Sequence, residues 1–96
     1  MLQTIINAIQ SRELIAFTYS GIARVVQPAA VGVSRAGNNV LRCYQTQGGH
    51  VTSGHTWDLC EIAQMTNLRA TGQNFAGDPP GYKRGDKGMV SIFAQL

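Results

Sequence analysis

The predicted fold is organised around two short stretches, Ala23-Arg24-Val25-Val26-Gln27-Pro28 and Asn39-Val40-Leu41-Arg42-Cys43-Tyr44-Gln45. Each combines apolar, β-forming residues with one arginine, which predicts two strands. A turn rich in Gly and Asn, Ala36-Gly37-Asn38-Asn39, separates them and indicates a hairpin. A strand pair of this kind either exposes its arginines to solvent or holds them around an anion, and that choice is the central functional question.

An amphipathic helix precedes the strands. Leu2, Ile5, Ile6 and Ile9 recur at i, i+3, i+4 and i+7, which places them on one helical face. This spacing predicts a helix from Leu2 to about Ser11. A helix of this length is unstable alone in water, so its apolar face must pack on the rest of the chain as core or lid, or else on a partner.

The flanking strands follow from the same composition. Ser20-Gly21 predicts a tight turn between the first two strands. Pro28 cannot donate a hydrogen bond to a β-ladder, so it marks a sheet edge or the end of regular pairing. The predicted strands are Leu14–Tyr19, Ile22–Gln27 resuming over Ala29–Ser34, Val40–Thr46, Trp57–Cys60 and Ile62–Leu68, the last two being separate strands or one bent strand.

The C-terminal part, residues 71–96, is predicted to be an extension that is irregular over Thr71 to Gly81, where glycines and prolines gather. Asp86 is a candidate helix N-cap. The residues that follow fit two patterns. Met89, Ile92, Phe93 and Leu96 have helical spacing, whereas Val90, Ile92, Ala94 and Leu96 alternate as in a strand. The pattern favours a short helix and leaves a strand open.

Together these elements predict a single domain over residues 1–96. The chain is 44% hydrophobic and 14% charged, which is typical of a globular protein, and its 11 glycines favour a turn-rich β protein over a helical bundle. A helix followed by short antiparallel strands indicates a mainly β (α+β) fold. We expect a small SH3-like or Sm-like antiparallel β-barrel, with its core over about residues 14–70.

Charge and cysteine content narrow the partners. The net charge of +3 permits a phosphate-bearing partner. No apolar run approaches the roughly 20 residues of a membrane span, and no basic region precedes an apolar segment, so neither a membrane contact nor a signal peptide is expected. Cys43 and Cys60 fall in predicted strands and are interpreted as small buried apolar residues. These features predict a reducing, cytoplasmic location.

A ligand site is predicted on the arginine-bearing strands and the loop that follows them. Alternation puts Arg42 and Tyr44 on one strand face, and arginine presents a planar fork of donors that matches phosphate. Aromatic rings can stack on a nucleic-acid base, and the glycine-rich loop over 47–55 lets backbone amides approach an anion. The predicted ligand-binding residues are Arg24, Arg42, Tyr44, Gln45, Gln47, His50, His55 and Trp57.

Structural roles are the alternatives for the same residues. Arg24 would instead form an ion pair with Glu61 or Asp58, Trp57 would belong to the core, and each histidine would be a surface residue. Catalysis is not predicted, because Asp58 and Glu61 form no convincing acid/base pair and the cysteines lack activating neighbours. The histidines and cysteines lack a recognised ligand spacing, so neither a metal nor a cofactor is expected.

The order of motifs resembles that of the WYL domain. The matching residues are Ala8-Ile9 at the end of the helix, Phe17-x-Tyr19, the Arg-x-Val-x-Pro set Arg24, Val26 and Pro28, Leu41 in the position of the family's leucine, then Trp57, Leu59, Ile62 and Phe75. The resemblance implies an Sm-like barrel that senses ligands, often nucleotides or nucleic acid, in transcription regulation or in phage defence. The family's usual DNA-binding helix-turn-helix has no counterpart in this sequence.

Two functions are therefore expected. The first is a stand-alone WYL-like module that binds a nucleotide, a cyclic oligonucleotide or a short single strand as a sensor or a sequestering protein. The alternative is a protein-interaction module that docks on a separate protein. A homo-oligomer is expected in either case, with the Leu2/Ile5/Ile9 face or the Met89 to Leu96 segment at the contact, because a core this small gains stability by self-association.

Overall fold

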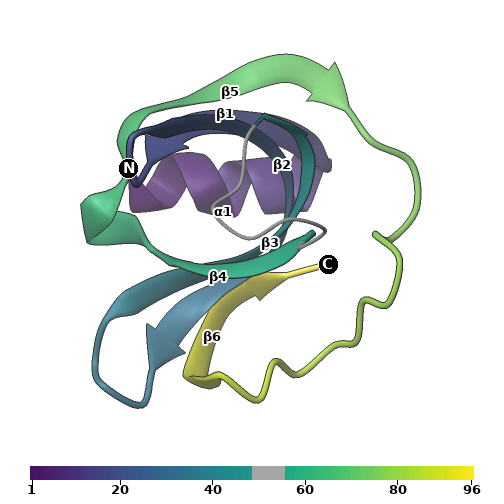
Figure 1. The fold of residues 1–96 in the computed structure, drawn as a ribbon. Helices are drawn as coiled ribbons and strands as arrows, with labels where there is room; N and C mark the ends of the chain where they lie inside the picture. Colours follow the sequence, from purple (N-terminus) through teal and green to yellow (C-terminus); the bar gives the residue numbers. More distant parts are fainter. Residues whose placement is uncertain (49–55) are drawn as a thin grey trace.

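The computed structural model describes residues 1–48 and 56–96, with the backbone alone at 47 and 48. It shows a mainly β, antiparallel fold with one N-terminal helix (Figure 1). The elements are α1 Leu2–Ser11, β1 Glu13–Tyr19, β2 Ile22–Ser34, β3 Asn39–Gly48, β4 Trp57–Glu61, a 3-10 turn η1 Ile62–Gln64, β5 Thr66–Asn74 and β6 Met89–Gln95. The strands form one sheet in the order β4-β3-β2-β1-β5, and β6 pairs with β2.

The helix forms where its apolar period predicts it. Ile5, Ala8 and Ile9 of α1 are buried. In Figure 1, α1 lies inside the curve that the strands make. The helix therefore supplies core to the sheet, and Ile5 and Ile9 are unavailable to a partner. This corrects the expectation that the Leu2/Ile5/Ile9 face forms an oligomer contact.

β2 is the central strand, and Pro28 divides it. Before the proline, β2 pairs with β1 as far as Ile15 opposite Val26. After it, β2 pairs with β6 from Ala30 onward. Pro28 lies between these two partners of β2. On the other side of β2 the pairing with β3 continues through Pro28, which is opposite Cys43, with a register shift before Ala30. The predicted interruption of regular pairing is therefore a change of neighbour on one side and a local irregularity on the other.

The remaining core is built by the inward-facing residues of the strands. Its largest members include Phe17, Ile15, Val26, Val31 and Leu41, none more than 1% exposed. Cys43 and Cys60, also 1% exposed, belong to the same cluster and are free thiols, as predicted. Contact with the Cys60 thiol and burial both raise the pKa of Cys43 well above its ordinary value, so this thiol is protonated and inert at neutral pH.

The sheet is curled, and in the part of the chain that is described no ladder joins β4 to β5. A closed barrel is therefore not confirmed. A hydrogen bond connects β4 to β1 instead. The backbone N–H of Glu61, at the end of β4, donates to the Tyr19 hydroxyl, at the end of β1, at 3.0 Å. The predicted strand at 62–68 is also corrected: η1 covers Ile62–Gln64 and the strand begins at Thr66.

The C-terminal part differs most from the prediction. Met89–Gln95 is a strand, not the favoured helix, because the second half of β2 offers it a free edge. β5 extends to Asn74, so residues 71–96 are not an irregular extension. The irregular part is residues 75–88, here called the strap, which runs from β5 to β6 along one side of the molecule (Figure 1).

Among the described residues, no helix has the length and apolarity needed to cross a membrane.

Candidate functional site

Arg24 lies on the inner side of the sheet and is 4% exposed. Its Nη1 donates to Oδ2 of Asp58 on β4 at 3.0 Å, and Nη2 donates to the Tyr19 carbonyl at 3.4 Å. The guanidinium also lies 5.3 Å from the centre of the Tyr19 ring. These contacts join β1, β2 and β4. Arg24 therefore has the structural role given above as the alternative to ligand binding, that of an ion-pair partner of Asp58.

Arg42 lies on the opposite, outward face of the sheet. It alternates along β3 with buried Leu41 and Cys43, and its side chain is 31% exposed. The prediction that Arg24 and Arg42 surround one anion is therefore wrong. The error arises because sequence alternation gives the faces within each strand but not how the two strands match.

Two aromatic rings lie on this outward face beside Arg42. Tyr44 of β3 is paired with Trp57 of β4, and their rings meet edge to face at 5.3 Å between centres. The Trp57 indole N–H donates to the carbonyl of Pro80 in the strap at 2.8 Å. Trp57 is thus fixed in position by a neighbouring ring on one side and by the strap on the other.

The strap covers part of the same face and is held at several points. At its start, Arg12 donates to the Gly77 carbonyl at 2.8 Å and to Asp78 at 2.9 Å. Near its end, Asp86 accepts from Arg42 through Nε at 2.7 Å and through Nη2 at 3.3 Å. Asp86 does not cap a helix as expected from sequence, since no helix follows it.

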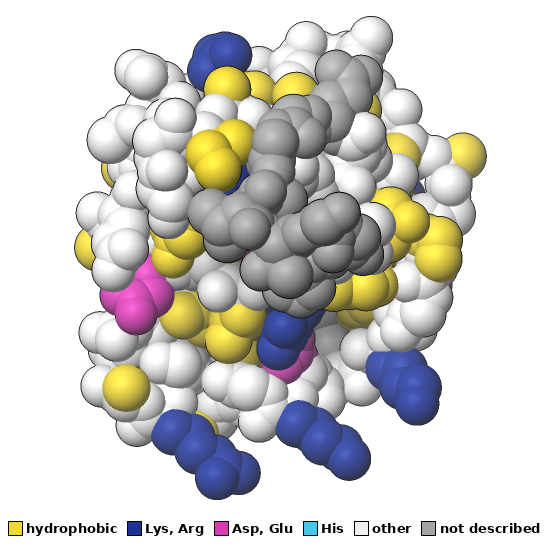
Figure 2. Space-filling model, viewed as in Figure 1, with side chains coloured by type: hydrophobic (Ala, Val, Ile, Leu, Met, Phe, Trp, Pro, Cys, Tyr) yellow, Lys and Arg dark blue, Asp and Glu magenta, His cyan; other side chains and the backbone are white. Residues whose placement is uncertain are grey.

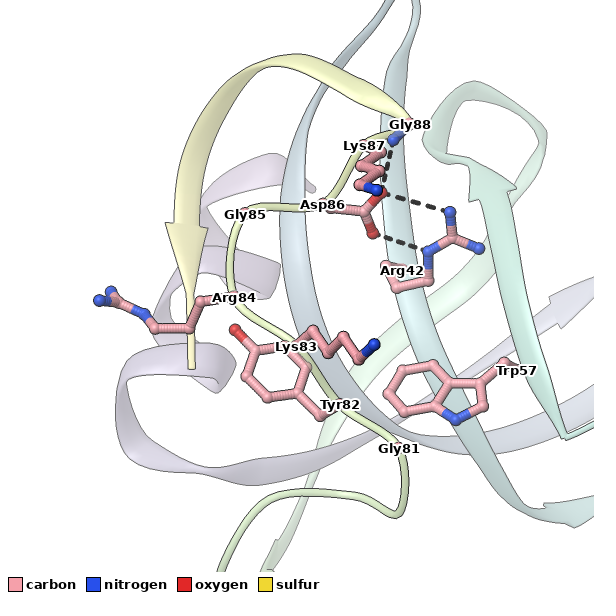
Figure 3. A pocket seen from close by; sticks show the side chains of 10 residues that line it. All are labelled: Arg42, Trp57, Gly81, Tyr82, Lys83, Arg84, Gly85, Asp86, Lys87 and Gly88. Atoms are coloured by element: carbon pink, nitrogen blue, oxygen red, sulfur yellow. Dashed lines mark hydrogen bonds and ion pairs between the residues drawn. The ribbon is translucent and has the colours of Figure 1, made fainter.

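Between the strap and the sheet lies a cavity of about 470 Å³ (Figure 3). Its lining comprises Arg42, Trp57 and the strap residues Gly81, Tyr82, Lys83, Arg84, Gly85, Asp86, Lys87 and Gly88. Figure 3 shows the Lys83 side chain extending between the rings of Tyr82 and Trp57, whereas the Arg84 guanidinium points away from them. The lining therefore combines cations with two aromatic rings.

The cavity lining carries more positive than negative charge. Arg42 is paired with Asp86, but no ion pair among the described residues engages Lys83 or Lys87, both of which are exposed. Figure 2 shows basic side chains spread along the lower edge of the molecule, toward the β2–β3 turn and the approach to β6. The cavity can accept negative charge.

The Asp86 carboxylate is ionised at neutral pH. The hydrogen bonds from Arg42 and, more weakly, from the Gly88 amide lower the pKa of Asp86, although burial opposes them. Because the pKa is lowered on folding, the stabilisation from this carboxylate is complete at neutral pH and is lost only as the pH falls through the lowered pKa.

The other predicted site residues either do not line the cavity or lie outside the described residues. Tyr44 supports Trp57 and does not line the cavity. The backbone N–H of Gln45 donates to the Thr56 carbonyl at 2.7 Å, and the Gln45 side chain is not part of the lining. The side chain of Gln47, and the whole of His50 and His55, lie outside the described residues.

The residues that sequence reasoning missed come from the strap. Tyr82, Lys83, Arg84 and Lys87 line the cavity, yet they lie in the predicted C-terminal extension, where no site residue was expected. A signal was present, since three cations occur within five positions between glycines. Within the described parts of the chain, no group of three His, Cys, Asp or Glu residues is arranged to hold a metal ion.

Fold and site together define a small antiparallel β protein with a cationic, aromatic-lined cavity on its outward face. Comparison with known protein families, with curated proteins and with solved structures finds no match to this chain. The resemblance to the WYL domain therefore stays a prediction.

Proposed function

We propose that this protein is a ligand-binding module for a nucleotide or a short single-stranded oligonucleotide, and that the cavity between the strap and the sheet is its site. The observation that carries the proposal is the lining itself, in which Arg42, Lys83 and Lys87 stand beside the rings of Trp57 and Tyr82. Cations bind phosphate, and an aromatic ring stacks on any nucleobase.

Size supports the same ligand class. Small-molecule sites commonly enclose roughly 300–1,000 Å³, and this cavity holds about 470 Å³. The indole N–H of Trp57 and the hydroxyl of Tyr82 already donate to the carbonyls of Pro80 and Leu96. These two side chains would therefore contact a ligand chiefly through their rings, and the lysines would supply the polar contacts.

The biological role follows from the WYL resemblance. We propose that the curled sheet is an Sm-like barrel left open between β4 and β5, and that the module senses or sequesters a signalling nucleotide in transcription regulation or phage defence. We propose that it acts in the cytoplasm, in keeping with a nucleotide ligand.

A binding assay on two arginine variants tests the proposal. Trp57 is the single tryptophan and lines the cavity, so its fluorescence reports on binding directly. With ATP as the probe, we expect Arg42→Ala to weaken binding about tenfold, the loss of one charge-assisted hydrogen bond. Arg42→Lys should recover only part of this loss, because an ammonium cannot form the two-pronged contact.

Arg35→Ala is the matched control for that test. Arg35 follows the end of β2 and is exposed, so its removal changes the net charge equally but should alter affinity by less than about twofold. Equal loss in Arg35→Ala and Arg42→Ala would mean general electrostatic attraction and no defined site. Thermal melts beside the titration separate binding from unfolding.

A second candidate function, docking on a protein, is favoured by the exposed apolar residues of β6. Val90 is 65% exposed and Phe93 is 44% exposed, on a strand that pairs with β2 on one side. Such residues on a β edge are a common contact surface. The same surface is our proposal for the contact in a homo-oligomer.

Light scattering tests this contact. We expect the protein to be oligomeric at high micromolar concentration, and Val90→Asp to be monomeric because it buries a charge in the contact. Ala23→Asp, at an exposed position on the part of β2 that pairs with β1, should leave the oligomer intact. A monomeric parent protein at that concentration would refute the contact.

A further inference from the structure

We propose that Asp86 is a built-in occupant of the ligand site, so that its carboxylate holds the Arg42 guanidinium until an anionic ligand displaces it. This inference rests on the proposed function, because it concerns how the same cavity receives its ligand. It identifies Asp86 as the residue that sets the affinity and selects for ligands that compete well for a guanidinium, namely those bearing phosphate.

The donors around Asp86 form the set that would bind a phosphate group. Arg42 approaches with Nε at 2.7 Å from Oδ2 and Nη2 at 3.3 Å from Oδ1. The Gly88 amide donates to Oδ1 at 2.8 Å. A guanidinium fork and a backbone N–H converging on two oxygens are the usual partners of phosphate oxygens. Asp86 presents its oxygens where a ligand's oxygens would be.

The ligand has a route to this position. The Asp86 side chain is 10% exposed and that of Arg42 is 31% exposed, so the pair lies in the cavity wall rather than in the core. Lys83 and Lys87 are exposed beside it. In Figure 3 the Asp86 carboxylate and Arg42 lie at one end of the cavity, and Lys83 extends across its middle. The lysines would attract the anion first, and Arg42 would engage it after Asp86 leaves.

The strap can release Asp86 and still stay attached. Its middle is fixed by bonds from the Tyr82 hydroxyl to the Leu96 carbonyl and from the Gly85 amide to Gln95 Oε1, each 2.9 Å long. Gly85 and Gly88 flank Asp86, and Gly85 has φ of +77°, a conformation that glycine adopts without strain. The displacement therefore requires the Asp86 side chain and the short segment from Gly85 to Gly88 to turn, with loss of the 3.2 Å bond from the Met89 amide to the Asp86 carbonyl. It does not require loss of the cavity.

Competition of this kind lowers the apparent affinity in a predictable way. When a site is open in only a fraction of molecules, the apparent dissociation constant rises by the inverse of that fraction. If Asp86 occupies the site in about nine molecules of ten, removing its charge should tighten binding by about tenfold.

The experiment compares Asp86→Asn with Asp78→Asn. Asparagine keeps the oxygen that accepts from the Gly88 amide, so the local turn is retained while the attraction to Arg42 is lost. Asp78 is in the same strap, pairs with Arg12 outside the cavity lining, and its replacement changes the net charge by the same amount. Affinity for ATP and for inorganic pyrophosphate is measured by calorimetry, with thermal melts. Should Asp86→Asn fail to fold, Asp86→Ser takes its place.

We expect Asp86→Asn to bind both probes about tenfold more tightly than the parent, and Asp78→Asn to bind as the parent does. Binding by Asp86→Asn alone would also support displacement. If the parent binds and Asp86→Asn binds equally or more weakly, Asp86 is not a competitor, although the proposed function stands. Equal tightening in both variants would mean a general charge effect and would overturn the inference. If no variant binds either probe, the inference and the proposed function fail together.

Discussion

Arg24→Ala is expected to lower the free energy of unfolding by about 3–5 kcal/mol, the usual cost of removing one partner from a buried ion pair. The Arg24 side chain is 3% exposed and that of Asp58 is 18% exposed, so little water reaches the pair to replace the lost bonds. Urea unfolding followed by circular dichroism measures the change. ATP affinity of the folded variant should match that of the parent protein, since Arg24 does not line the cavity.

The matched control is the ion pair between Arg12 and Asp78. Its nitrogen–oxygen distance is 2.9 Å against 3.0 Å for Arg24 and Asp58, but its side chains are 38% and 52% exposed. Asp78→Ala should therefore cost at most about 1 kcal/mol. If Arg24→Ala costs no more than Asp78→Ala, burial does not strengthen the Arg24 pair. If Arg24→Ala abolishes ATP binding in a protein that is still folded, Arg24 belongs to the ligand site after all.

Gly32→Ala is expected to destabilise the protein by about 3 kcal/mol, at the upper end of the usual cost of overpacking. A Cβ at Gly32 would meet the carbonyl oxygen of Ser91 and would lie 2.9 Å from the Cα of Ile92, both on β6. These are backbone atoms, so no side-chain rotation can make room. β6 would have to move away from β2, losing ladder hydrogen bonds and the packing of Met89 and Ile92.

Gly37→Ala separates this clash from the ordinary cost of replacing a glycine. Gly37 has φ of +86° and nothing within 4 Å of an added Cβ, so alanine there suffers backbone strain alone. We expect a loss of about 1–2 kcal/mol, smaller than that of Gly32→Ala, with urea unfolding as the measurement. A Gly32→Ala protein as stable as the parent would show that β6 does not pack against Gly32 as described.

The three members of the Arg-x-Val-x-Pro set differ in how far their roles can be predicted from the sequence. Val26 is core, Pro28 marks the change of neighbour along β2, and Arg24 is a buried ion-pair partner. The roles of Val26 and Pro28 follow from local properties, namely side-chain alternation and the missing N–H. The role of Arg24 depends on a residue 34 positions away, so sequence could only offer it as one of two alternatives.

Local sequence was sufficient to predict the helix over 2–11, the first three strands and the turn at Ser20-Gly21, because each depends on neighbours a few residues apart. The burial of both cysteines was predicted from their apolar character. Long-range contacts determine which arginine faces a cavity and that Asp86 opposes it, since the Arg42–Asp86 contact joins residues 44 apart. Long-range pairing also selects strand over helix at Met89–Gln95. Both patterns satisfied the local sequence there, and the free edge of β2 beyond Pro28 supplied the hydrogen bonds that only a strand can use.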